Sequence, residues 1–324
     1  MNYKIKIGEY MLQMLDSITI AKSVENLADM ATIVIPGTYI NQALQVENKI
    51  KEGDAVEVYF GYGESFLLEF KGYLNSISTD DSAIKLECED ALYLFKKSLK
   101  DRELKNISLE GLLDIVIGEV NAQNKENETP TNYTVSCDYE FKWEKFVFFK
   151  ATAFDVLKKV QDETKANIYF KDEILHIHPQ YSEIFNDELV IYDFARNIEK
   201  SDLKYVLLKN KKIEIEVNAT LVDGKKKKFS YGVTGGTKKT IELGTTDDAS
   251  MKNRAIQEYN LFAYDGYEGS FTGWLIPVVE PAYKIRLQDS DYPNKNGNYY
   301  VVAVETKFSS SGGVRTVTIG KKIG

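Results

Sequence analysis

The chain has 324 residues, which exceeds the usual size of one hydrophobic core and predicts two or three domains. Hydrophobic residues make up 43% of it and charged residues 28%, with a formal net charge of −8. This acidic balance argues against nucleic acid or an anionic membrane as the main partner, because both require a basic surface. Residues 1–6 alternate polar and apolar side chains, so they contain no secretory signal, and no apolar run is long enough to cross a bilayer.

Cysteine and aromatic content indicate where and how the chain folds. Two cysteines, Cys88 and Cys137, are too few for a disulfide scaffold, so we expect folding in a reducing cytosol. Cys88 shares the inward side of its predicted strand with Ile84 and Leu86, which favours a small buried hydrophobe. The 21 tyrosines and 16 phenylalanines, against 6 prolines, favour strands and partly exposed contact surfaces.

Residues 1–98 predict a first small β-barrel closed by a short helix. Alternating apolar residues predict strands at 2–7, 17–21 and 31–35, the last ending at a Pro36-Gly37 turn. A strand–turn–strand–turn–strand pattern follows, with strands at 55–60, 66–77 and 83–88. Leu92, Phe95 and Leu99 then recur at helical spacing.

Residues 99–180 predict a small α+β domain. Ser108 is a suitable N-cap for a helix over 109–120, and the polar residues 121–131 predict an exposed loop. Thr152 and Asp155 have the spacing of a capping box and predict a helix that runs to 165. Strands at 167–170 and 174–178 then predict a hairpin.

Residues 181–217 and 273–324 predict a second small β-barrel, interrupted by an inserted β/α segment at 218–272. Before and within the insertion we expect strands at 206–208, 213–217 and 240–243, a hairpin turn at Asp223-Gly224 and a helix over 246–260. Strands at 283–287, 299–308 and 314–319 close the chain in the same order as in the first barrel. The predicted fold class is therefore α+β, mainly β, with two related small β-barrels and an α+β domain between them.

His176 and His178 are the first candidate site. They flank Ile177 on a predicted strand, so both point to one face, about 6.5–7 Å apart, and could bind zinc if further ligands arrived. The sequence offers no nearby cysteine or third histidine, and Asp172 and Glu173 lie in a turn. We therefore expect a solvated strand face and no metal.

Three loops resemble ligand-binding motifs, but each departs from its motif in the residues that the ligand requires. Loop 289–298 has Pro293 and Asn294 where a calcium loop needs Asp or Asn and then Gly, so Asn296-Gly297 is interpreted as a hairpin turn. Loop 232–240 has Thr237 where a phosphate loop needs glycine. Loop 61–63 holds too few glycines for a dinucleotide, and we expect no cofactor.

Charged residues give two further hypotheses. The run 225–228 of four lysines is interpreted as a solvated loop that also blunts a strand edge, with contact to an acidic neighbour in an assembly as the alternative. The adjacent pairs Asp80-Asp81 and Asp247-Asp248 are interpreted as caps rather than an acid/base couple. With no Ser–His–Asp or Cys–His set either, we expect no catalytic residues and no enzymatic activity.

Several segments, in this order, resemble the baseplate hub family. GDAVEV (53–58), FKGYL (70–74) and LECED (86–90) resemble its opening domain. The family comprises the late control D proteins of contractile-tail phages and the hub half of type VI secretion spike proteins. Residues 197–203, EGSFTG (268–273), YYVV (299–302) and GGVR (312–315) extend the resemblance over nearly the full length. One departure is Pro281-Ala282-Tyr283, where the family usually has a Gly-Asp turn.

The resemblance implies a structural hub that forms a homotrimer. Each subunit would supply two barrels, giving a pseudo-six-fold ring that connects a six-fold tail tube to a three-fold spike. Expected partners are two further copies of the chain, a spike protein, the tail tube or its initiator, and other baseplate proteins. Because the chain stops at Gly324, just after the second barrel, we expect the spike to be a separate polypeptide.

The resemblance also implies synthesis in the bacterial cytoplasm and assembly into a virion tail or a contractile injection particle. Two alternatives remain. One is a carbohydrate-binding tail adhesin with a tyrosine-lined groove. The other is a tail-associated cell-wall hydrolase, against which the missing acid/base pair counts.

Overall fold

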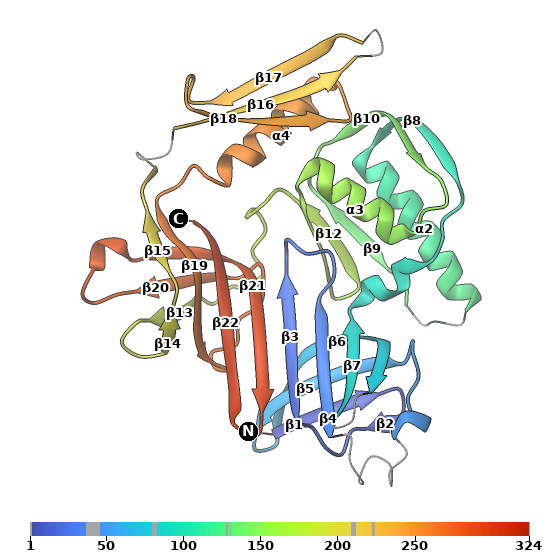
Figure 1. The fold of residues 1–324 in the computed structure, drawn as a ribbon, viewed down its shortest axis with the longest axis vertical. Helices are drawn as coiled ribbons and strands as arrows, with labels where there is room; N and C mark the ends of the chain where they lie inside the picture. The colour runs from blue at the N-terminus through green and yellow to red at the C-terminus, as the bar shows by residue number, and fades with distance from the viewer. Residues whose placement is uncertain are drawn as a thin grey trace.

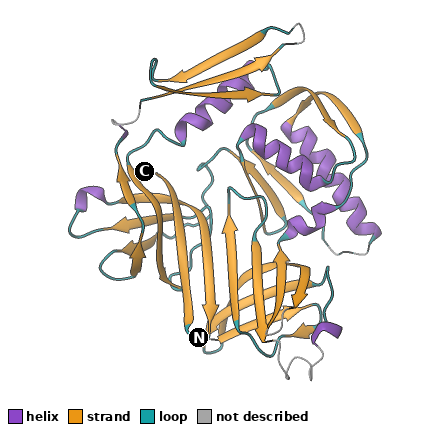
Figure 2. Cartoon of the chain, viewed as in Figure 1, coloured by secondary structure: helices purple, strands orange, loops and turns teal. Residues whose placement is uncertain are grey.

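The structure is a computed structural model that describes residues 2–36, 46–79, 83–127, 129, 131–208, 212–221 and 224–323. The predicted turn residues Gly37, Asp80, Asp81 and Asp223 lie outside these ranges. Strands dominate, and the longer helices lie outside the two β lobes described below (Figure 2). This arrangement confirms the predicted fold class.

The first lobe is a curved antiparallel sheet formed by the N-terminal strands (Figure 1). Its strands are β1 (Asn2–Ile7), β2 (Tyr10–Met11), β3 (Ser17–Ser23), β4 (Met30–Pro36), β5 (Ala55–Tyr62), β6 (Ser65–Thr79) and β7 (Ala83–Glu89). Side chains alternate between the two faces of each strand, so Ile5, Val58 and Leu86 point into one core. Cys88 is also fully buried there, as expected. Two 3₁₀ helices, η1 (Val46–Asn48) and η2 (Ala91–Lys96), accompany the sheet.

The second lobe is built from the C-terminal strands and curls back on itself. Its strands are β13 (Val190–Asp193), β14 (Ile198–Ser201), β15 (Lys204–Val206), β19 (Gly266–Trp274), β20 (Lys284–Gln288), β21 (Gly297–Ser309) and β22 (Gly312–Lys322). A tight turn between Asp193 and Asn197 joins the edge strands β13 and β14, with the Asn197 amide 3.1 Å from the Asp193 carbonyl. The short 3₁₀ helix η4 (Pro293–Lys295) lies between β20 and β21.

The two lobes share one strand order. The first lobe is ordered β1-β5-β6-β7-β4-β3 and the second β13-β20-β21-β22-β19-β14. We number the strands of each lobe in chain order and leave out the short strands β2 and β15. Both sheets then have the strand order 1-4-5-6-3-2. They differ at one edge, because β1 is antiparallel to β5 whereas β13 is parallel to β20. The three-strand pattern predicted at both ends of the chain is therefore part of a longer topological repeat.

A strand pair fuses the lobes into a single sheet. β21 of the second lobe pairs antiparallel with β3 of the first, Ala303 facing Ser23 and Ser309 facing Ser17. The two strands lie side by side at the centre of the molecule (Figure 1). The result is a 14-stranded sheet in which the described pairings run from β14 to β2 without returning to their start. The lobes are thus joined through backbone hydrogen bonds as well as side chains.

The middle of the chain forms an α+β unit around the largest apolar cluster. It contains β8 (Arg102–Ser108), α2 (Leu109–Glu126), β9 (Thr134–Cys137), β10 (Lys142–Phe148), α3 (Ala153–Thr164), β11 (Asn167–Lys171) and β12 (Ile174–His178). Ser108 caps α2 by accepting from the Gly111 amide, and Thr152 forms the predicted capping box with Asp155 at α3. Trp143 is one of the largest side chains of the cluster and is 2% exposed.

Helix α2 is longer than predicted, because its polar last turns are held by hydrogen bonds rather than solvated. The prediction of an exposed loop from residue 121 is wrong over 121–126. Asn124 is fully buried and accepts from the Lys97 ammonium at 2.9 Å. Asn121 exchanges two hydrogen bonds of 2.8 Å with the backbone of Tyr133.

The inserted segment is a three-stranded sheet with one helix across it. It consists of β16 (Ile213–Thr220), β17 (Lys226–Gly232), β18 (Thr237–Leu243) and α4 (Asp248–Asn260), in the strand order β17-β16-β18. β16 therefore belongs to the insertion, whereas β19 pairs with β22 in the main sheet. We propose residues 207–265 as the inserted segment in place of 218–272, and the other predicted boundaries remain proposals. Within the described residues, no helix combines the length and hydropathy of a membrane span.

Candidate functional site

A buried ion pair joins the two lobes. Glu69 of β6 and Arg315 of β22 are 5% and 1% exposed. The Arg315 guanidinium donates from Nη2 to both Glu69 carboxylate oxygens, at 2.6 and 2.7 Å. Its Nη1 donates to the Leu275 carbonyl at 2.7 Å, and Thr306 donates to Glu69 at 2.8 Å. Both carboxylate oxygens accept from the guanidinium in an almost dry site, so the pair fixes one lobe against the other.

This pair was not predicted from the sequence. Glu69 is placed at the lobe border by an irregularity in the strand pairing, because Val58 pairs with Phe70 and Tyr59 with Leu68, leaving Glu69 between them. The available signal was a lone acidic residue inside the apolar run FLLEF (66–70). Its partner lies 246 residues further along the chain and left no local signal.

Exposed apolar side chains border the same ion pair. Leu67 and Leu68 precede Glu69 and are 54% and 48% exposed, while Trp274 and Ile276, which flank Leu275, are each 57% exposed. We call Leu67, Leu68, Trp274 and Ile276 the border patch. Large exposed apolar side chains, here next in sequence to residues of a buried ion pair, are typical of protein contact surfaces.

The two histidines do not lie on a solvated face, and that prediction is wrong. His176 and His178 are 6% and 2% exposed, because residues 179–189 and strand β21 cover their side of β12. Glu183, which was not predicted from the sequence, places one carboxylate oxygen 3.3 Å from His176 Nδ1 and 3.1 Å from His178 Nε2. Among the described residues, no three His, Cys, Asp or Glu side chains are grouped as metal ligands require. Asp172 lies in the β11–β12 turn, as predicted.

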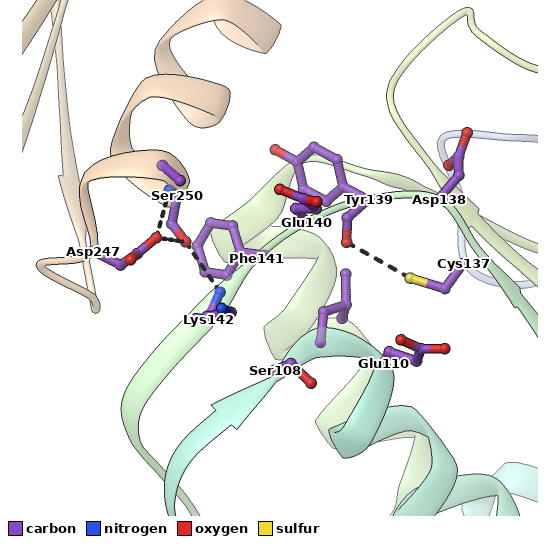
Figure 3. A pocket seen from close by; sticks show the side chains of 12 residues that line it. Ser108, Glu110, Cys137, Asp138, Tyr139, Glu140, Phe141, Lys142, Asp247 and Ser250 are labelled. Atoms are coloured by element: carbon purple, nitrogen blue, oxygen red, sulfur yellow. Dashed lines mark hydrogen bonds between the residues drawn. The ribbon is translucent and has the colours of Figure 1, made fainter.

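A pocket of about 480 Å³ lies between the starts of α2 and α4 and residues 137–142 (Figure 3). Asp247 is the N-cap of α4, as expected, and accepts from the Ser250 amide and hydroxyl at 2.8 Å. The amide hydrogen bond lowers the pKa of Asp247 and keeps it ionised. Burial raises the pKa of the Cys137 thiol, which leaves it protonated and a poor nucleophile. Asp247 and Ser250 therefore serve the cap of α4, and Cys137 is not an activated nucleophile.

The rejected loop motifs use their polar groups internally. In loop 289–298, the Asp289 carboxylate accepts from the backbone amides of Asp291 and Tyr292, and the Asp289 amide donates to Asn296. In loop 232–240, which connects two strands, the Gly235 amide donates to Glu214 at 3.1 Å. Neither loop presents a ring of free donors or acceptors to a ligand.

The lysine run is paired within its own sheet and helix. Lys226 lies 3.8 Å from Glu242, Lys227 3.0 Å from Asp248 and Lys228 3.5 Å from Glu216. Lys226, Lys227 and Lys228 lie on strand β17, so the predicted loop is wrong for these three residues. Strand β17 is at the edge of the inserted sheet, which agrees with the strand-edge part of the interpretation.

Comparison with known proteins identifies the fold through structure rather than sequence. No protein-family model matches the chain, and no curated protein sequence matches it. A tail protein from Neisseria meningitidis MC58 superposes with a TM-score of 0.69 at 13% identity, covering 98% of this chain and 96% of the other. The prophage MuSo2 43 kDa tail protein from Shewanella oneidensis gives 0.65 at 15% identity, with 98% of each chain covered.

A third similar structure comes from a secretion system. It is an Escherichia coli component of the type VI secretion system, described as structurally similar to bacteriophage T4 tail proteins. Its TM-score is 0.60 at 9% identity, with 99% of this chain and 79% of the other covered. The chain therefore has the fold of these phage tail proteins and of this component of the type VI secretion system.

Proposed function

We propose that the chain is a structural baseplate hub of a phage or a phage-tail-like contractile injection particle. Three copies would form a pseudo-six-fold ring that connects a six-fold tail tube to a three-fold spike. The observation that carries this proposal is the shared strand order of the two lobes, because three copies of a chain with two alike lobes present six similar faces. The hub would act through stable contacts, without catalytic turnover.

The similar structures and the exposed border patch support the same role. The similar structures are tail proteins and a secretion component described as resembling tail proteins. We propose that the spike, the tail tube or its initiator, and other baseplate proteins are the partners, and that the border patch contributes to the contact between subunits. Tyrosines give little support to a sugar-binding groove, because seven of them lie in cores: Tyr133, Tyr139, Tyr169, Tyr192, Tyr267, Tyr299 and Tyr300.

The mass of the protein in solution tests the trimer. The subunit mass is 36.9 kDa, so three copies give 3 × 36.9, about 111 kDa, by light scattering, and negative-stain images should show a ring with a central hole. A protein that stays monomeric at micromolar concentration, without a ring, would argue against the hub.

Charge substitution in the border patch tests the proposed contact. The double variant Trp274→Glu/Ile276→Glu is expected to raise the concentration needed for assembly at least tenfold, about 1.4 kcal/mol, because a buried contact would have to accept two unpaired carboxylates. Phe149→Glu is the control, since Phe149 is 66% exposed and belongs to the α+β unit rather than to the border patch. Equal assembly of the double variant and the wild type would remove the patch from the interface.

A further inference from the structure

The joint between the two lobes shows how one lobe pairs with another. Strand β21 has β22 along one edge, and its other edge is divided between two partners. The first part of that edge, residues 297–300, pairs with β20, and the later part, residues 303–309, pairs with β3. An edge strand of the first lobe is thus added to the half of β21 that β20 leaves unpaired.

The first lobe has the same half-paired edge on β6, which is the counterpart of β21 in the shared strand order. β7 pairs with one edge of β6 over residues 73–79, and β5 pairs with the other edge only over residues 65–73. Leu74 still exchanges backbone hydrogen bonds of 2.8 Å with the turn before β5. Beyond Leu74, no strand of the described chain pairs with this edge of residues 75–79.

The second lobe has a matching edge on β14, which is the counterpart of β3. β14 pairs with β19, and the described pairings of the main sheet end at β14. β14 and β6 are the two ends of the run β14-β19-β22-β21-β3-β4-β7-β6, in which the β3–β21 joint is central. In Figure 1 they lie on opposite sides of that joint. The chain therefore has the two halves of a second joint, placed where they do not meet.

We propose that these two edges pair between copies of the chain, with β14 of one copy antiparallel to residues 75–79 of β6 in the next. This inference rests on the proposed trimeric hub. A contact between two different edges is passed from copy to copy, and it closes into a ring when the rotation between copies allows it. In a ring of three copies, each of the six lobes would meet the next by the same kind of strand addition.

The joint within the chain also predicts the register between copies. In each lobe, one row of inward residues across the sheet starts from the first inward residue of the edge strand. The rows are Ile18, Ile33, Leu86 and Ile77 in the first lobe and Ile198, Gly273, Arg315 and Thr306 in the second. Phe308 lies two residues after Thr306 and faces Ile18 across the joint. By the same relation Thr79, two residues after Ile77, faces Ile198 of the next copy.

The neighbouring outward pair is suited to a test. Within the chain, Lys307 faces Thr19 across the joint. The corresponding pair between copies is Ser78 and Lys200, because a register shift after Ile198 makes Lys200 the counterpart of Thr19. Ser78 and Lys200 are both exposed in the single chain, so their replacement leaves the core intact.

Cysteine crosslinking of the full chain tests the pairing. In the variant Ser78→Cys/Lys200→Cys, mild oxidation should link copies into covalent dimers and trimers, because directly opposed strand residues lie within disulfide range. The matched control is Thr19→Cys/Lys307→Cys, whose disulfide should form inside one chain and keep the mass of a monomer. Neither Ser78→Cys nor Lys200→Cys alone should give a covalent trimer.

The outcomes separate the strand pairing from the hub itself. A trimer by light scattering that does not crosslink in Ser78→Cys/Lys200→Cys, while the control disulfide forms, overturns the pairing and leaves the hub. A protein that stays monomeric overturns both.

Hydrogen exchange of the wild type decides if the cysteine variant does not fold. Outward amides of residues 75–79 and 198–201 should be protected at least tenfold more above the assembly concentration than below it, because they gain strand partners. The edge strand β17 is the control and should not change. Equal protection of residues 75–79 and 198–201 in both states overturns the pairing.

Discussion

Replacing Arg315 with methionine is expected to lower the free energy of unfolding by about 3–5 kcal/mol, as measured by urea denaturation. The substitution keeps a long apolar stem but leaves the Glu69 carboxylate buried, with Thr306 as its remaining side-chain donor. An ionised carboxylate without a cationic partner is among the most costly groups to bury. The effect should be large because the ion pair is almost fully enclosed at the lobe border.

The double variant Glu69→Met/Arg315→Met shows how much the intact pair contributes to the free energy of unfolding, as distinct from the cost of leaving Glu69 unpaired. A buried ion pair that is replaced on both sides by apolar groups often loses little stability, so the double variant should recover most of the loss. A loss below about 1 kcal/mol in Arg315→Met would show that water reaches Glu69 and that the pair does not fix the lobes.

Trp143→Ala is expected to cost about 3–5 kcal/mol in the free energy of unfolding, by loss of burial and creation of a cavity. The indole lies 4.7 Å from the Phe141 ring and 5.0 Å from the Phe146 ring, measured between centroids, and it donates to Glu163. The neighbouring α2 and α3 are held by their own caps and packing, so they cannot collapse fully into the space.

Phe149→Ala is the matched control for Trp143→Ala. Phe149 follows the same strand but is 66% exposed, so its removal should change the free energy of unfolding by no more than about 0.5 kcal/mol. Similar losses in both variants would mean that the cluster around Trp143 is loosely packed.

Features set by neighbouring residues could be predicted from the sequence. Three helix starts follow from one cap each, at Ser108, Thr152 and Asp247, because a cap satisfies amides within the next three residues. The strands of the repeated pattern follow from alternation with a period of two. Both signals lie within a single element and need no partner from elsewhere in the chain.

Features set by distant residues could not be predicted. β8 pairs with β10, yet RELKNIS carries no apolar alternation that would indicate a strand. The pairing of β3 with β21 joins an edge strand of the first lobe to the C-terminal half of an interior strand of the second, and the two strands come from opposite ends of the chain. His176 and His178 have the expected spacing, but their burial is decided by residues 179–189, which carry no regular pattern.

The hydrogen bonds between β3 and β21 make the resistance of this joint to force depend on the direction of the force. A pull that peels the two strands apart would open their hydrogen bonds one after another, whereas a thrust along the strand axis would load them all together. A component built in this way resists sliding more than peeling. In a particle that drives a tube forward, the joint would carry most load if the thrust ran along these strands.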